Sequence, residues 1–311
     1  MAEDSCITIK IKDGGGAIMQ FKRYNNVNDF YRETYDVLMR HEAQNLIPLG
    51  NIIIGRNGND KTGWRNPANW YMATVSDSNG IRLTAVMTPP HNIAIYATDN
   101  IISDDALNCL IKGLKNEPIP GVITEKTLAE CFAKAYTYQN NKNYETTMGQ
   151  RIYELTTVNK YVSQVGTMRL MDEKDMPFFP YWVEAFHTSE QHDKTVMPIP
   201  KDAGAYTYLL SQKKLYVLEH NGIPVSMAGF TREMQTVVGV AFVYTPPYYR
   251  EKGYATACVA KLSQLALDKG FKKCVLYTDL ANPTSNSIYQ KIGYRPICDS
   301  LMLKFTNKGV F

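Results

Sequence analysis

Apolar and polar residues alternate in short stretches through the first half of the sequence, and the period of each stretch predicts a strand or a helix. In residues 7–11 every second residue is Ile, and an apolar stretch at 17–21 follows three glycines, so we expect a β-hairpin. Residues 29–47 carry apolar side chains at helical spacing. The other elements expected in this half are strands at 71–75, 81–87 and 151–156 and helices near 103–114 and 124–138.

A second series of elements begins at residue 166. A short strand at 167–170 is followed by Asp172, a residue type that commonly caps a helix N-terminus, and then by an amphipathic segment. The remaining elements expected here are a helix at 202–212, strands at 215–219, 225–230 and 237–244, and then a helix, a strand, a helix and a final strand. We therefore place a boundary near Val165, between mixed α/β domains of residues 1–165 and 166–311.

The composition fits globular domains and argues against several classes of protein. The 311 residues are 44% hydrophobic and 21% charged, which is enough apolar surface for a buried core. No stretch approaches the ~20 apolar residues of a membrane span, and the acidic start has no apolar segment behind it, so we expect no secretory signal and a cytoplasmic location. The net charge of +4, without a dense Lys/Arg run, gives no indication of a nucleic-acid partner.

Cysteine and histidine do not suggest a metal site. The six cysteines include no Cys-x-x-Cys pair, and we interpret them as small core residues in a reducing compartment. The closest histidines, His187 and His192, are five residues apart, whereas zinc-binding helices place two histidines four apart. We therefore expect no metal.

A strand, a turn and a helix in the second half predict an anion site. The apolar strand 237–244 stops at Pro246 and Pro247, which cannot extend a β-ladder, and residues 250–255 lead into a helix. The free backbone N–H groups and the dipole at such a helix N-terminus attract anions. Gly253 allows a ligand to approach the backbone, although Arg-x-x-Gly is a short motif that also fits an ordinary strand–turn–helix.

The following residues repeat the strand–helix arrangement. A buried strand at 274–278 leads to Asn282, a suitable N-cap, with Pro283 at the first helical position and Gly293 at the helix end. Parallel strands that are each followed by a helix present both helix N-termini at one sheet edge, where ligands bind in such sheets.

These two segments resemble the GNAT superfamily of acyl-CoA-dependent N-acetyltransferases. Residues 240–255 are similar to its acyl-CoA motif, a strand followed by Arg/Gln-x-x-Gly-x-Gly/Ala and a helix. Residues 282–294 are similar to its Asn-x-x-Ala-x-x-Leu-Tyr-x-x-x-Gly-Phe motif, with mild replacements at Ser285, Ile288 and Tyr294. The element order from 167 to 305 also follows the family, so the resemblance covers close to half of the chain. It implies a mixed central sheet flanked by helices, acetyl-CoA as cofactor, and direct attack of an amine on the thioester.

The resemblance also implies roles for individual residues. Pantetheine would pair with the strand at Phe242, Val243 and Tyr244, and pyrophosphate would bind the N–H groups of Arg250, Glu251, Lys252, Gly253, Tyr254 and Ala255. Asn282 would contact the cofactor, with Ser285 and Asn286 near its phosphate or adenosine end, although a cap and a solvated helix residue equally explain Asn282 and Asn286. Tyr289 matches the family tyrosine that protonates the departing thiolate.

The base and the acceptor are not assigned by the sequence. The base candidates are Glu219, Glu233 and Asp279, each of which is also explained as a surface carboxylate, and ordered water is an alternative. We expect the acceptor, a small amine or a peptide, near Trp182, Phe186 and His187, which also fit a helix core.

The first half contains strands and helices but no cofactor motif. Thr-Pro-Pro occurs at 88–90 and again at 245–247, yet the two copies are not in register with the turns before them. We interpret residues 1–165 as a diverged, non-catalytic GNAT-like domain beside a catalytic one. Two alternatives are a non-catalytic acyl-CoA-binding or regulatory module and an aminoacyl-tRNA-dependent transferase, which needs a tRNA-binding surface that a charge of +4 does not support.

Overall fold

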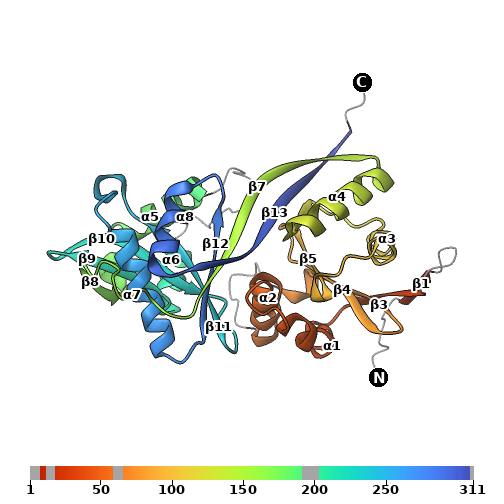
Figure 1. Cartoon of the computed structure of the whole chain (residues 1–311), viewed down its shortest axis with the longest axis horizontal. Coiled ribbons are helices and arrows are strands. Elements are labelled where there is room, and N and C mark those ends of the chain that lie inside the picture. The colour runs from red at the N-terminus through yellow and green to blue at the C-terminus, as the bar shows by residue number, and fades with distance from the viewer. Residues whose placement is uncertain (1–7, 12–17, 59–65, 191–202, 309–311) are drawn as a thin grey trace. The chain divides into compact units, whose positions relative to one another are not determined.

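The structure is a computed structural model that describes residues 8–11, 18–58, 66–190 and 203–308. Two compact units make up the chain (Figure 1). Unit 1 contains residues 1–149 and 299–311, and unit 2 contains residues 150–298.

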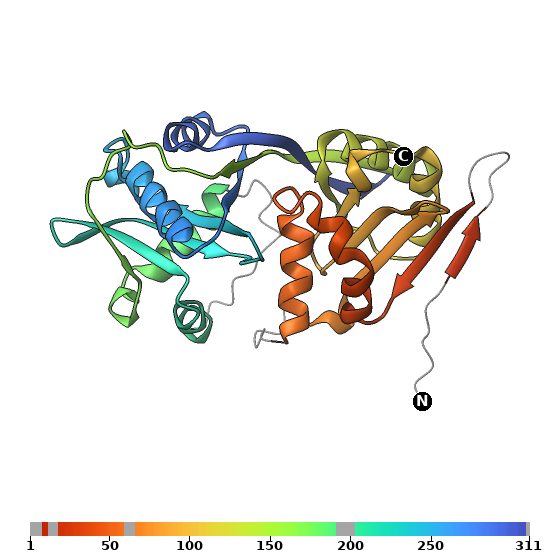
Figure 2. The ribbon, with the colours of Figure 1, turned by 60° about the horizontal axis from the view of Figure 1, so that its bottom comes forward.

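Unit 1 is a sheet with helices on both faces. Its strands run in the order β1-β2-β3-β4-β5-β6-β13. In chain order its elements are β1 (Thr8–Ile11), β2 (Met19–Tyr24), α1 (Val27–Met39), α2 (Leu46–Asn57), η1 (Pro67–Asn69), β3 (Tyr71–Asp77), β4 (Gly80–Met87), β5 (Ile93–Ala97), η2 (Thr98–Asn100), α3 (Asp104–Gly113), β6 (Gly121–Glu125), α4 (Lys126–Asn140), the start of β7 (Lys142–Leu155) and the end of β13 (Arg295–Asn307). Helices α1 and α2 lie on one face of this sheet, and α3 and α4 cover the other (Figure 2).

Unit 2 has the same layered construction. Its sheet order is β8-β9-β10-β11-β12-β7. The elements are β8 (Thr167–Leu170), η3 (Glu173–Asp175), α5 (Phe179–Glu190), α6 (Ala203–Ser211), β9 (Leu215–His220), β10 (Ile223–Thr231), β11 (Val237–Tyr244), η4 (Pro247–Tyr249), α7 (Tyr254–Asp268), β12 (Lys273–Asp279) and α8 (Pro283–Ile292). Successive strand residues point to opposite faces. Leu218 accordingly packs with α7 and α8, whereas Val217 packs with α5 and α6.

Both halves of the chain follow one element order. From β2 to β7, and again from β8 to β13, the order is β-α-α-β-β-β-α-β-α-β when the short 3-10 helices are left aside. The last strand of each half lies in the other unit: residues 150–155 of β7 pair with β12, and residues 300–304 of β13 pair with β6. The units therefore divide at 149/150 and 298/299, not at residue 165, because strand pairing across the sheets decides the boundary.

Most of the expected elements are confirmed. The first hairpin forms with Thr8 opposite Lys22, although its glycine turn lies outside the described residues. The expected helix 29–47 is wrong: it is two helices, α1 and α2, because the chain turns at residues 40–45, where the Asn45 amide donates to the Leu38 carbonyl at 2.9 Å. Strands β5 and β6 were not expected, since each has only five residues, most of them buried, and shows no clear alternation of apolar and polar side chains.

Two further expectations concern repeats and membranes. Thr88 follows β4, whereas Thr245 follows β11, whose counterpart by element order is β5. The two Thr-Pro-Pro copies are therefore not equivalent. Among the helices that the structure describes, none is long and apolar enough to cross a membrane.

Candidate functional site

Strands β11 and β12 diverge at the centre of unit 2. They pair in parallel at only three positions, from Val237 opposite Lys273 to Gly239 opposite Val275. Both strands continue beyond this point, to Tyr244 and Asp279. Backbone groups of β11 that face β12 past Gly239 thus have no partner strand, and an extended ligand can pair with them.

A β-bulge deforms β11 in this diverging part. Gly229 and Met227 of β10 lie opposite Ala241 and Tyr244, so three steps along β11 match two along β10. Phe242 sits in the bulge with a φ of 56°, a left-handed conformation that a bulky residue seldom adopts. Such strain is typical of functional sites. The Ser226 hydroxyl, 3.2 Å from the Tyr244 carbonyl, holds the end of the strand.

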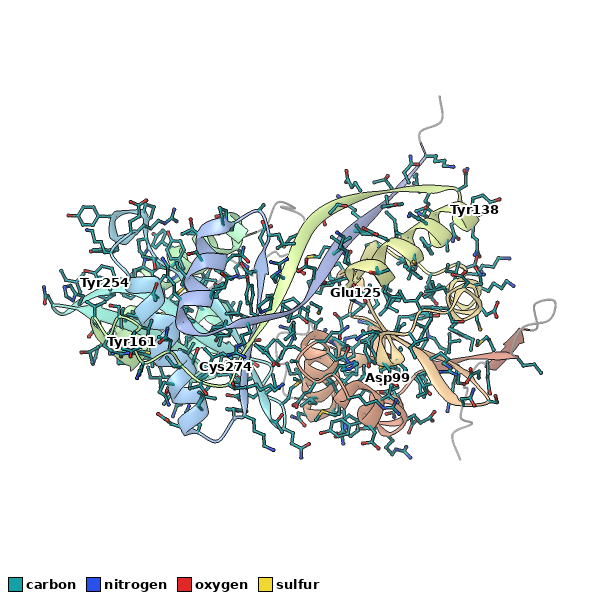
Figure 3. The ribbon with its side chains drawn as sticks, viewed as in Figure 1. Asp99, Glu125, Tyr138, Tyr161, Tyr254 and Cys274 are labelled. Carbon is teal, nitrogen blue, oxygen red and sulfur yellow. The ribbon has the colours of Figure 1, made fainter. Side chains whose placement is uncertain are left out.

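The turn after β11 leads to an uncapped helix N-terminus. Pro247 starts the short helix η4, and the chain then passes through Gly253, which has a φ of 80° and is the N-cap of α7. Gly253 has no side chain to cap the helix, no acidic residue lies in the first turn, and the first intrahelical bond is Ala257 N–H to the Gly253 carbonyl at 3.0 Å. The N–H groups of residues 254–256 are therefore available to an anion. Tyr254 marks this position in Figure 3.

Two basic side chains belong to the same turn. Arg250 is exposed, and its Nε donates to the Thr245 carbonyl at 3.0 Å, which ties the turn to the end of β11. The Lys252 Nζ lies 4.6 Å from the centre of the Tyr248 ring. Glu251 has a φ of 62° and Gly253 a φ of 80°, so a left-handed residue lies on each side of Lys252 just before the helix. The turn before α7 thus carries two basic side chains and the acidic Glu251.

Residues 279–293 form the second predicted segment. Asn282 caps α8 by accepting a hydrogen bond from the Ser285 N–H at 3.0 Å, with Pro283 at the first position and Gly293 at the end, as expected. Asn286 is not a solvated helix residue: its amide donates to the Asp279 and Asn282 carbonyls. Both asparagines thus have local structural roles, and a contact with a cofactor stays a prediction.

Tyr289 lies on the buried side of α8. Only 8% of its surface is exposed, and its ring centre is 6.4 Å from that of Tyr153 and 5.9 Å from that of Tyr294. Helices α7 and α8 cover the same face of the sheet, so Tyr289 and the α7 N-terminus belong to one side of the diverging strands. Its role as an acid stays a prediction.

Tyr153 supports this arrangement and was not expected. It lies on β7 opposite Leu276 of β12. Its hydroxyl donates to the side-chain oxygen Oδ1 of Asn286 at 3.1 Å and accepts from the side-chain amide of Gln290 at 3.3 Å. The sequence predicted a strand at 151–156, but no local signal indicated that this strand pairs with β12.

The three candidate bases are all engaged elsewhere. Glu219 accepts from Arg169, which also binds Asp175 with two further hydrogen bonds. Glu233 pairs with Lys214 at 2.6 Å and precedes β11, so a strand of roughly 23 Å separates it from Tyr244.

Asp279 closes the turn after β12. Its carboxylate accepts from the Ala281 N–H at 2.8 Å, and only 8% of the residue is exposed. The structure does not bring the three carboxylates together.

Aromatic residues line the opposite face of the bulge. Trp182 lies 5.9 Å from Tyr244, and Phe186 lies 5.6 Å from Phe242, measured between ring centres. His187 is 6.0 Å from Phe242, and burial lowers the pKa of its imidazole below the usual 6.5. The three predicted acceptor residues therefore border the bulged end of β11, at the margin of a hydrophobic core.

The buried cysteines of unit 2 are poor nucleophiles. Burial raises the pKa of both Cys258 and Cys274 to about 12, so both thiols stay protonated near neutral pH. Cys274 lies at the start of β12 (Figure 3). Among the described residues, no group of three His, Cys, Asp or Glu side chains is arranged to hold a metal ion.

The chain is similar to one known family and to several solved structures. The model of the acetyltransferase (GNAT) family matches residues 171–294. A Drosophila protein solved by structural genomics superimposes with a TM-score of 0.64 at 11% identity, covering 94% of this chain and 100% of that one.

Two solved acetyltransferase structures are similar over three quarters of the chain. A GCN5-related N-acetyltransferase from Sphaerobacter thermophilus has a TM-score of 0.52 at 13% identity, covering 77% of this chain and 82% of its own. A GNAT-family acetyltransferase from Colwellia psychrerythraea has a TM-score of 0.50 at 12% identity, with coverages of 76% and 85%. Identities this low show the fold alone, and no curated protein matches the sequence. Residues 171–294, which include the diverging strands, therefore match the model of the acetyltransferase (GNAT) family.

Proposed function

We propose that unit 2 transfers the acetyl group of acetyl-CoA to the amine of a small molecule or peptide. The observation that carries this proposal is the opening between β11 and β12 beside the uncapped N-terminus of α7. A pantetheine chain extends along a strand, and a pyrophosphate binds helix N–H groups, so the two features fit the two parts of one cofactor.

The residues of this unit have distinct tasks in the proposed reaction. The N–H groups of residues 254–256 and the side chain of Arg250 bind pyrophosphate, and Phe242 to Tyr244 pair with pantetheine. Acetyl-CoA supplies an activated thioester when bound. Tyr289 gives its phenolic proton to the departing sulfur, a task for which general-acid catalysis contributes ~10²–10⁴ in rate. Holding amine and thioester together contributes an effective molarity of ~10⁵–10⁸ M.

Unit 1 is proposed to bind no acyl-CoA. The helix α3, which corresponds to α7, is capped by the Ser103 hydroxyl and carries Asp104 and Asp105 in its first turn, which repel an anion. Strands β5 and β6 also diverge after two parallel pairs, but the Thr124 hydroxyl donates to the Ile95 carbonyl at 2.5 Å and occupies the backbone acceptor there.

Two measurements test the proposal. Acetyl-CoA at 100 times its Kd should stabilise the folded chain by about 2.7 kcal/mol and raise the Tm. Release of CoA should then be followed with amino acids, polyamines, aminoglycosides and peptide N-termini. A Tm that does not respond to acetyl-CoA contradicts the proposal, and a raised Tm without CoA release from any amine favours the non-catalytic acyl-CoA-binding module.

Tyr289→Phe tests the acid role. It should lower kcat and leave the Tm shift with acetyl-CoA unchanged, because the ring still packs against Tyr153 and Tyr294. Tyr138→Phe is the matched control, since Tyr138 is 89% exposed in unit 1 (Figure 3). Equal turnover in both variants rejects the acid role.

A further inference from the structure

The imidazole of His187 lies against the strained residue of β11. Its ring centre is 6.0 Å from that of Phe242 with an interplanar angle of 86°, and 5.2 Å from that of Phe186. Phe242 is the bulge residue beyond the last β11–β12 pair. Helix α5 therefore places an ionisable side chain at the diverging strands, on the face opposite α7 and α8.

The ring nitrogens of His187 have no hydrogen-bond partner in the described part of the chain. Within the described residues, no hydrogen bond or ion pair holds this imidazole, whereas the ring of His41 in unit 1 is bound to the Tyr96 hydroxyl at 2.8 Å. The ionisable groups around it are Glu184 on the same helix, whose carboxylate accepts from the Tyr206 hydroxyl of α6, and Tyr244 on β11. Burial lowers the pKa of this imidazole below 6.5, so His187 is neutral at pH 7, the form that accepts a proton.

His187 lies where the proposed cofactor would place its thioester. With pyrophosphate at Gly253 and pantetheine running back along β11 from Tyr244, the thioester end of the cofactor reaches the bulge at Phe242. His187 borders that end, while Glu219 and Glu233 are held in ion pairs with Arg169 and Lys214.

We propose that His187 is the general base of the reaction, an inference that rests on the proposed function. The amine nitrogen attacks the thioester carbonyl carbon with its lone pair, and the C–N bond forms. The C–S bond breaks, its electron pair leaves with sulfur, and the thiolate takes the proton of Tyr289. The proton lost by the amine nitrogen goes to the free imidazole nitrogen of His187. Solvent then removes the proton from the imidazolium and returns one to the phenolate.

His187→Gln tests this role, with His41→Gln as the matched control from unit 1. Both variants should show the wild-type Tm shift with acetyl-CoA. For the best amine of the panel, His187→Gln should lower kcat about 10²-fold or more with an unchanged KM for acetyl-CoA. The titration of His187 below pH 6.5 should disappear from the kcat/KM profile of this variant, which leaves only the acidic fall caused by protonation of the amine itself. Wild-type turnover with an intact acidic limb in His187→Gln overturns the proposal.

A labelling experiment on the wild-type protein needs no acceptor. Diethyl pyrocarbonate modifies accessible imidazoles, and mass spectrometry locates the product. Acetyl-CoA at saturation should slow modification of His187 several-fold and leave that of His41 unchanged. Unchanged labelling of His187 in a protein whose Tm responds to acetyl-CoA overturns the proposal alone. A Tm that does not respond removes the proposed function as well, so the two failures are distinguishable.

Discussion

The pairing of β7 with β12 in unit 2 predicts which fragments of this chain can fold. Residues 150–155 of β7 pair with β12 from Gln150 opposite Asp279 to Leu155 opposite Cys274. A fragment that starts at the expected boundary, 166–298, lacks this strand, whereas the fragment 150–298 is the whole of unit 2. We expect the longer fragment to fold and the shorter one not to fold.

The size of the effect follows from burial. Ile152, Tyr153 and Leu155 are 2%, 0% and 1% exposed. Burying an apolar side chain of this size contributes about 1.5–3 kcal/mol, so the three together contribute roughly 5–9 kcal/mol. The free energy of unfolding of a domain is roughly 5–15 kcal/mol. Losing the strand therefore removes most of the stability, and it also leaves the backbone groups of β12 unpaired.

Thermal unfolding followed by circular dichroism compares the two fragments. Fragment 150–298 should unfold cooperatively, and acetyl-CoA should raise its Tm. Fragment 150–311 is the control, because residues 299–311 belong to unit 1 and should add no stability. A cooperative transition of 166–298 within a few degrees of 150–298 refutes the reasoning. If neither fragment folds, Tyr153→Ala in the full chain should lower the Tm, and an unchanged Tm there refutes it equally.

Three further predictions concern single side chains. Tyr153→Phe removes a hydroxyl that bonds two α8 side chains and should lower the free energy of unfolding by about 1–2 kcal/mol in urea titrations; no loss would contradict its supporting role. Gly253→Val should weaken acetyl-CoA binding at least tenfold, as measured by calorimetry. Gly270→Val is the control, because Gly270 also has a positive φ and open space but lies at the other end of α7; it should lower the stability and leave the affinity unchanged. Equal affinities of the two variants would remove the helix N-terminus from the site. Burial lowers the pKa of His187 in the folded state below the 6.5 of the unfolded chain. Below pH 6.5 the unfolded state therefore binds a proton before the folded state does, and the free energy of unfolding falls as the pH drops, whereas above pH 6.5 this loss is absent. The loss of Tm between pH 7 and pH 5 should therefore be smaller in His187→Gln, and an equal loss would show that this group does not titrate on unfolding.

Local signals predicted the ends of α8 and the turn before α7 well. Asn282, Pro283 and Gly293 lie at the start and end of α8 as expected, because capping depends on residues within one helical turn. The turn between β11 and α7 was predicted for the same reason, since Pro247 fixes its own φ and Gly253 allows a positive φ. The hydrogen bonds of Asn286 could not be predicted in this way, since one partner, Tyr153, is distant in sequence.

The sequence by itself determined the element order of unit 2 and the position of the turn between β11 and α7, because short-range hydrophobic period, caps and glycines encode them. Only the tertiary structure decided that β7 pairs with β12 and β13 with β6, since many strands offer the same apolar face and pairing depends on the whole sheet. It also decided that His187 faces the bulge at Phe242, while Glu219 and Glu233 are held in ion pairs. A side chain's neighbours across a sheet lie too far along the chain for any local pattern to specify them.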